Sequence, residues 1–282
     1  MSRARVSDLL RLSPGQLVDL DTIDPSSTPG FGHGKKRARR EVQELAERLS
    51  ELHTRLHAAS RGGSRDRVLL LIQGSDCSGK DGIARHVVRL LEPMWLHYAA
   101  FGKPTEAELR HHFLWRIRRQ LPEPGQIVMH NRSHYEDVLV ARVHNLVAPG
   151  IWQKRYAEIN SFEQRLIDDG LRLVKVMLHL SPQEQRTRLL GRLEDPAKRW
   201  KYNPGDVDER AFQVDYKTAY EAALAQCSTA AAPWFVVPAD RKWYRDWAVA
   251  NLLLEALQDI DPQYPPPDFD VATELTRLEG SA

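Results

Sequence analysis

Gly74-Ser75-Asp76-Cys77-Ser78-Gly79-Lys80-Asp81-Gly82, GSDCSGKDG in one-letter code, is the stretch that decides the fold. It follows most of the pattern G-x-x-x-x-G-K-[ST], in which backbone N–H groups of a glycine loop bind phosphate. Asp81 replaces the hydroxyl residue that normally holds Mg²⁺, and a second acid lies inside the loop at Asp76. Since a metal must then be held by carboxylates, we expect Asp76 to be a metal ligand. The alternatives are that Asp76 caps the next helix and that Asp81 stabilises its N-terminus.

The residues around the loop give the context that phosphate binding requires. The continuous apolar run at 67–73 predicts a strand buried on both faces, and a helix is expected to follow the loop at 83–91. Further strands are expected to start at Leu96, Gln126, Arg172 and Trp234. Helices are expected at 39–61, 106–120, 136–145, 151–168, 182–193, 208–226 and 243–257. This alternation predicts an α/β fold with a parallel sheet and helices on both faces.

A second group of polar residues follows the strand that starts at Gln126. The segment NRSHYED places Asn131, Arg132, Glu136 and Asp137 at the carboxyl end of a strand, where ligands collect in open α/β sheets. Arginine there can clamp a phosphoryl group, and carboxylates can bind Mg²⁺ or orient an acceptor. The alternative is a simple helix start in which Ser133 caps and Glu136 completes a capping box.

A third feature is the basic stretch from Gln183 to Lys201, which predicts a mobile lid at about 182–207 that closes over phosphates. The alternative is a solvated helix face. A shorter basic run, KKRARR at 35–40, leads into an amphipathic helix and is expected to face solvent rather than to bind nucleic acid.

Length and composition indicate one soluble domain. The chain has 282 residues, 42% hydrophobic and 28% charged, and no apolar run of membrane-spanning length. We expect an extended arm at 1–34, one domain at 35–266 and a tail at 267–282. The N-terminus lacks a signal-peptide pattern, so a cytoplasmic location is expected, without membrane partners.

Six motifs in this order, GSDCSGKDG, KPTEAEL, FLWRIRRQLP, NRSHYEDVLVARV, RLEDPAKRWK and APWFVVPADRKWYR, resemble the polyphosphate kinase 2 family, in its polyphosphate:nucleotide phosphotransferase branch. The resemblance implies a thymidylate-kinase-like P-loop kinase fold with a helical lid. It also implies transfer of phosphate, dependent on Mg²⁺ or Mn²⁺, between inorganic polyphosphate and nucleoside mono- or diphosphates (AMP/ADP, possibly GMP/GDP), and a homo-oligomer.

The resemblance also assigns roles to residues. Four groups are expected: catalytic Asp76, Lys80, Arg132 and Glu136; phosphate- or nucleotide-binding Gly74, Ser78, Gly79, Lys80, Asp81, Gly82, Asn131, Arg132 and Asp137; polyphosphate-binding Arg186, Arg192, Lys198 and Lys201; and metal-binding Asp76 and Asp137. Two rival functions share the loop and the sheet: a conventional ATP-dependent nucleoside monophosphate kinase, and a catalytically weak sensor that binds polyphosphate or nucleotide.

Overall fold

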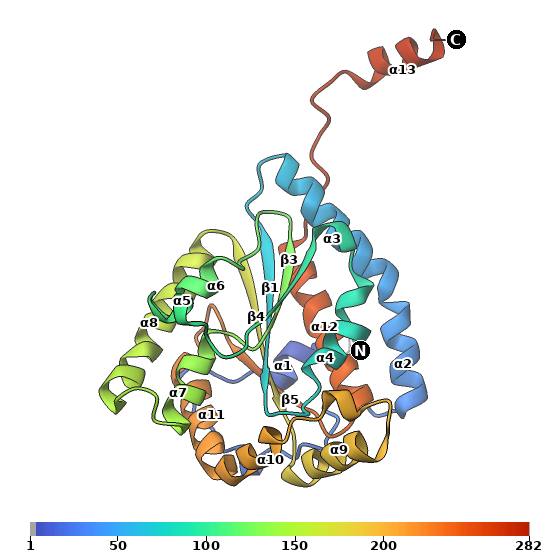
Figure 1. The fold of residues 1–282 in the computed structure, drawn as a ribbon. Helices are drawn as coiled ribbons and strands as arrows, with labels where there is room; N and C mark the ends of the chain where they lie inside the picture. The colour runs from blue at the N-terminus through green and yellow to red at the C-terminus, as the bar shows by residue number, and fades with distance from the viewer. Residues whose placement is uncertain (1–3, 282) are drawn as a thin grey trace.

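A parallel five-stranded sheet forms the centre of the protein (Figure 1). The computed structural model describes residues 4–281. The sheet order is β2-β3-β1-β4-β5, and every neighbouring pair is parallel. The strands are β1 (Arg67–Gly74), β2 (Leu96–Ala100), β3 (Ile127–Asn131), β4 (Leu171–His179) and β5 (Trp234–Pro238). The expected α/β fold is confirmed.

Strand β1 explains why the sheet is covered on both sides. All eight of its residues are buried. Val68, Leu70 and Ile72 belong to one hydrophobic cluster, whereas Leu69 and Leu71 belong to another on the opposite face. Since successive strand side chains point to opposite faces, a continuous apolar run is the pattern expected of a central parallel strand.

Helices pack on each of these clusters. One face carries α1 (Val6–Leu10), α2 (Lys35–Glu44), α3 (Ala46–Arg61), α4 (Lys80–His86) and α12 (Lys242–Ile260). The other face carries α7 (Val140–Val143), α8 (Pro149–Asp168) and α11 (Gln213–Cys227). The remaining short helices in the body are α5 (Glu106–Leu109), α6 (Trp115–Arg118), α9 (Pro182–Glu194), α10 (Gly205–Asp208) and the 3₁₀ turns η1 to η6.

Five of the expected helices are interrupted or shortened in the structure. The helix expected at 83–91 becomes α4, which ends at His86, and the 3₁₀ turn η2 (Val88–Leu90). The helix expected at 39–61 begins at Lys35 and divides at Leu45 into α2 and α3. The helix expected at 106–120 becomes α5 and α6, which are separated by residues 110–114. The helix expected at 136–145 becomes η4 (His134–Asp137) and α7. The helix expected at 208–226 starts only at Gln213, after a 3₁₀ turn.

The two ends of the chain behave differently. Within the expected arm, Val6 and Leu10 are buried, and Arg11 forms an isolated bridge with Phe235 of β5. At the other end, α13 (Val271–Glu279) has no buried residue and projects away from the body (Figure 1). Residues 1–3 of the expected arm and residue 282 of the expected tail lie outside the described part. Across residues 4–281, no helix is both long and apolar enough to span a bilayer.

Candidate phosphate-transfer site

The glycine loop connects the end of β1 to the start of α4 and has the geometry of an anion cradle. Gly79 has a φ of 104°, a left-handed conformation that side chains disfavour. The hydroxyl of Ser78 is buried and has no hydrogen-bond partner within residues 4–281. This hydroxyl is therefore available to a ligand bound in the loop.

Lys80, the first residue of α4, folds its side chain back onto the start of the loop. Its side chain is buried, and Nζ donates hydrogen bonds to the carbonyl oxygens of Gly74 (2.6 Å) and Ser75 (3.1 Å). Burial lowers the pKa of the Lys80 ammonium, although the carboxylates of Asp76, Glu136 and Asp81 oppose that shift. The ammonium therefore lies at the mouth of the loop among carboxylates, where an anionic ligand can exchange for the carbonyl contacts.

Two arginines support the loop from behind, and the sequence did not reveal either role. Arg245 of α12 is 2% exposed and donates to the Ser78 carbonyl oxygen at 3.1 Å. A Cβ atom on Gly79 or Gly82 would lie 1.6 Å or 2.4 Å from its guanidinium nitrogens. Arg188 of α9 donates to the carbonyl oxygens of Cys77 (2.9 Å) and Ser78 (3.2 Å). The glycines at 79 and 82 thus make room for Arg245.

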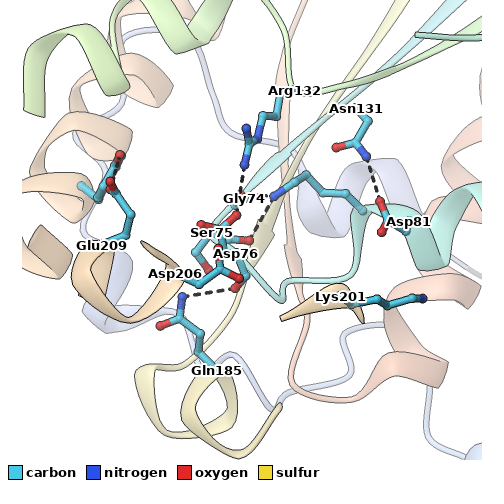
Figure 2. A network of polar contacts seen from close by, with 12 residues as sticks. Gly74, Ser75, Asp76, Asp81, Asn131, Arg132, Gln185, Lys201, Asp206 and Glu209 are labelled. Carbon is cyan, nitrogen blue, oxygen red and sulfur yellow. Dashed lines mark hydrogen bonds and ion pairs between the residues drawn. The ribbon is translucent and has the colours of Figure 1, made fainter. Parts of the chain in front are cut away.

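Arg132 reaches the loop from the end of β3. Its φ of 65° turns the chain sharply after the strand, and its backbone N–H donates to the carbonyl oxygen of Ile72. Its Nη2 donates to Oδ1 of Asp76 at 3.1 Å (Figure 2). Both side chains remain partly exposed, at 38% for Arg132 and 28% for Asp76. The structure therefore brings the expected arginine and the expected loop acid into direct contact.

The two acids that follow Arg132 have different surroundings. Burial raises the pKa of the Glu136 carboxyl, with Arg132 and Lys80 opposing the shift. Burial also raises the pKa of Asp137, opposed by Arg155, which lies 3.2 Å from its Oδ1. Ser133 accepts from the backbone N–H of Tyr135, so the capping box expected with Glu136 does not form. The Glu136 side chain instead lines the cavity.

Asn131 and Asp81 contact each other rather than the centre of the loop. The amide nitrogen of Asn131 donates to Oδ1 of Asp81 (3.0 Å) and to the hydroxyl of Tyr98 (2.7 Å). Asp81 lies in the first turn of α4, where a carboxylate stabilises the helix N-terminus. This pair fastens α4 to the end of β3 (Figure 2).

Two further residues gather around Asp76. Gln185 of α9 donates to the backbone carbonyl of Asp76 at 3.2 Å. Burial and the charge of Asp76 raise the pKa of Asp206 in α10, opposed by Arg192, and both acids line the same cavity (Figure 2). Neither residue carried a sequence signal, because each lies more than 100 positions from the loop in an ordinary helical pattern. In residues 4–281, no three His, Cys, Asp or Glu side chains form a metal-binding group.

The four basic residues expected to bind polyphosphate are not gathered at one point. Arg192 pairs with Asp206 (3.1 Å) and also donates to the carbonyl oxygen of Lys201. Lys198 pairs with Asp195 on its own turn, at 2.6 Å. The Lys201 ammonium lies 4.9 Å from the ring centre of Trp200, which is 77% exposed. Arg186 points to solvent on α9.

These elements enclose a cavity of about 760 Å³. Gly74, Ser75, Asp76, Arg132, Glu136 and Asp137 line its floor, and it continues past Lys103 and Arg116 on one side and past Tyr216 and Tyr220 on another. Ligand sites of small organic molecules have this size range. A phosphate loop, a cavity beside it and a basic helical segment above it form an arrangement suited to phosphoryl transfer.

Comparisons with known proteins agree with this geometry. The model of the family "Polyphosphate kinase 2 (PPK2)" matches residues 33–265. An AMP/ADP-polyphosphate phosphotransferase from Meiothermus ruber is 44% identical over 92% of this chain and 95% of its own length. An ADP-polyphosphate phosphotransferase from Rhodopseudomonas palustris is 38% identical over 90% of this chain and 91% of its own.

A solved structure is similar over nearly the whole chain. The crystal structure of Polyphosphate Kinase 2 from Arthrobacter aurescens TC1 superposes with a TM-score of 0.96 at 43% identity. The match covers 99% of this chain and 98% of that one. The similarity therefore includes the lid segment and both ends of the chain as well as the sheet.

Proposed function

Because this chain belongs to the polyphosphate kinase 2 family, we propose that it transfers phosphate between inorganic polyphosphate and nucleoside mono- or diphosphates. The relatives that match over nearly their full length carry the names of AMP/ADP- and ADP-polyphosphate phosphotransferases. The observation that carries the proposal is the contact between Arg132 and Asp76 at the mouth of the phosphate loop. It supports the proposal because a cation and a carboxylate side by side at the phosphate loop suit a site where donor and acceptor phosphates would meet.

Each of these residues has a separate role in an in-line phosphoryl transfer. Lys80 and Arg132 neutralise the charge that develops on the transferred phosphoryl group, and the N–H groups of the loop hold the donor phosphate. Asp76 helps to orient the attacking phosphate oxygen. Glu136, facing Arg132 and Lys80 within the cavity, keeps both cations in position. Positioning and electrostatics supply most of the rate enhancement in this kind of reaction.

A divalent cation, Mg²⁺ or Mn²⁺, fits the acid pair Asp76 and Asp206. Mg²⁺ in kinases is commonly bound by one or two carboxylates together with substrate phosphates, so a three-residue protein cage is not needed. When bound, the ion would screen the charge between donor and acceptor phosphates. Asp206 and Asp137, the second ligand expected from the sequence, each pair with an arginine, Arg192 at 3.1 Å and Arg155 at 3.2 Å. Of the two, only Asp206 has Asp76 among the main charges that shift its pKa. We therefore expect Asp206→Asn to raise the half-saturating Mg²⁺ concentration more than Asp137→Asn does; the reverse order would restore Asp137 as the ligand.

The two substrates are assigned to different sides of the site. The acceptor nucleotide occupies the cavity between Arg132, Asp137, Lys103 and Arg116. Polyphosphate lies over the loop under the lid, where Arg186, Arg192, Lys198 and Lys201 provide positive charge. A cytoplasmic location and a homo-oligomer complete the proposal; the mass of the purified protein in solution tests the second.

The decisive experiment measures nucleotide products from purified protein with Mg²⁺ and long-chain polyphosphate. AMP, ADP, GMP and GDP are offered separately, beside a control with ATP and a nucleoside monophosphate. Product with polyphosphate as donor supports the proposal and identifies the acceptor. Product only with ATP would establish the conventional kinase, and binding without product in either arm would establish the sensor.

A further inference from the structure

We propose that the basic start of α2, Lys35, Lys36 and Arg39, forms with Lys242 a second polyphosphate-binding surface that holds the part of a long chain extending beyond the lid. This inference rests on the proposed function, since it takes polyphosphate as the substrate. All four side chains are exposed. None has a carboxylate within ion-pair distance in residues 4–281, whereas Arg37 and Arg40 pair with Glu41 and Glu44.

The distribution of charge along α2 is expected to destabilise this helix. Its first turn contains no acid, its N-cap Gly34 makes no side-chain cap, and its last turn contains no base. Cations near a helix N-terminus and anions near its C-terminus oppose the helix dipole. The pairs Arg37–Glu41 and Arg40–Glu44 also have the less favourable order along the helix. A local rule broken without a structural gain is expected where function requires it.

The two helices that carry this surface lie against each other. Helices α2 and α12 pack along each other, and Trp247 of α12 donates to Glu41 of α2 at 2.9 Å. Just before α2, the ring of Phe31 lies 5.7 Å from that of Trp243, the neighbour of Lys242. The two helices therefore begin at the same edge of the molecule (Figure 1).

Lys242 lies within electrostatic range of the lid. Its exposed ammonium is partly desolvated, which lowers its pKa, and the positive charges of Arg188, Arg245 and Lys198 lower the pKa further, against Glu184. Arg188 and Arg245 are buried against the loop carbonyls, whereas Lys198 is exposed. Exposed positive charge therefore occurs in the lid, at Lys198, and next to the start of α2, at Lys242. A polyanion with one charge or more per repeating unit suits charges spread over a surface in this way better than a compact nucleotide does.

The test compares a short with a long donor in the variant Lys35→Gln/Lys36→Gln/Arg39→Gln. Tetraphosphate reaches only the loop and the lid, so its KM and kcat should match those of the parent protein. The KM for long-chain polyphosphate should rise about 10-fold. Its dependence on salt concentration should become shallower, because fewer counterions are released on binding. The variant should melt no lower than the parent, since it loses cations that oppose the helix dipole.

The matched control is Arg61→Gln/Arg165→Gln/Arg172→Gln, which should leave the long-chain KM unchanged. It removes the same charge near the ends of α3 and α8 and the start of β4, away from the phosphate loop. Equilibrium binding of long-chain polyphosphate is also measured without nucleotide, so that the binding surface is tested independently of the proposed phosphate transfer. Weaker binding by the variant supports the surface even if no product forms. An unchanged long-chain KM and affinity would overturn the inference. So would an equal loss with tetraphosphate.

Discussion

Two clusters of charge lie on either side of the short turn that follows β3, and they are built differently. Behind the turn, Glu163 and Lys175 are sealed in the core, with Lys175 Nζ 2.6 Å from Glu163 Oε2. Tyr135 and His134 both contact Oε1 of Glu163, at 2.8 Å and 3.0 Å. In front of the turn, Arg132 and Asp76 share one 3.1 Å contact and remain partly exposed.

The difference shows how charged residues that stabilise the fold can be distinguished from charged residues that bind a substrate. Each oxygen of the sealed Glu163 has a protein partner, so this carboxylate has no acceptor left for a substrate. The open pair leaves donors and acceptors unused and faces a cavity. The sealed cluster therefore fixes the position of the turn, and the open cluster binds what enters. Predictions that perturb each cluster separately should affect stability in one and turnover in the other.

Replacing Lys175 with Met should have the largest effect, a loss of about 3–5 kcal/mol in the free energy of unfolding, because it leaves the Glu163 carboxylate buried without its cation. Urea denaturation measures it. The double variant Lys175→Met/Glu163→Leu should recover much of the loss, since it removes both charges. A single variant as stable as the parent would mean that the cluster does not hold the turn.

Asp76→Asn should lower kcat about 100- to 1000-fold, because it removes a charge that acts on the reacting phosphates. Nucleotide affinity and the unfolding midpoint should change little, since Asp76 is partly exposed and makes one ion pair. Steady-state kinetics and nucleotide titration measure the two effects. Asp268→Asn, an exposed acid in the C-terminal segment, is the matched control. Unchanged turnover in Asp76→Asn would remove this residue from the mechanism.

Gly82→Ala should lower kcat/KM for polyphosphate about 10-fold, because the new Cβ would lie 2.4 Å from Arg245 and displace the guanidinium that supports the loop. The control is Gly191→Ala in α9, where a Cβ meets no atom within 4 Å. Adding Arg245→Ser to Gly82→Ala tests the cause. If the clash is responsible, the second change should cost much less activity in the presence of the first than alone.

The sequence predicted the loop and its sheet well because both depend on local pattern. A continuous apolar strand followed by glycines and a lysine leaves few alternatives, and the turn at Arg132 comes directly after another such strand. The lid predicted at about 182–207 stays a prediction, and the most connected residue of its basic stretch, Arg188, turns inward to the loop carbonyls. Spacing alone does not say which of several cations faces inward.

What the sequence could not predict depends on contacts between distant segments. Asp206 and Gln185 approach Asp76 only because α9 and α10 fold back over the loop, and their local sequence resembles any polar helix. Arg245 lies in a long amphipathic helix where burial of an arginine is unexpected. The need for Gly82 becomes clear only once Arg245 is placed beneath it.

The smallest predicted effect is on how the stability of the protein depends on pH, through a histidine on the buried side of the turn after β3. Burial lowers the pKa of His130 on β3 to about 4 from 6.5, with nearby His134 adding to the shift and the Gln120 carbonyl opposing it. Folded His130 is therefore neutral where unfolded His130 takes up a proton, so stability falls as pH drops from 6.5 towards 4. His130→Gln should make that decline shallower in urea midpoints measured across this range, with exposed His97→Gln as the control. An equal slope in His130→Gln and the parent would show that this side does not sense pH through His130.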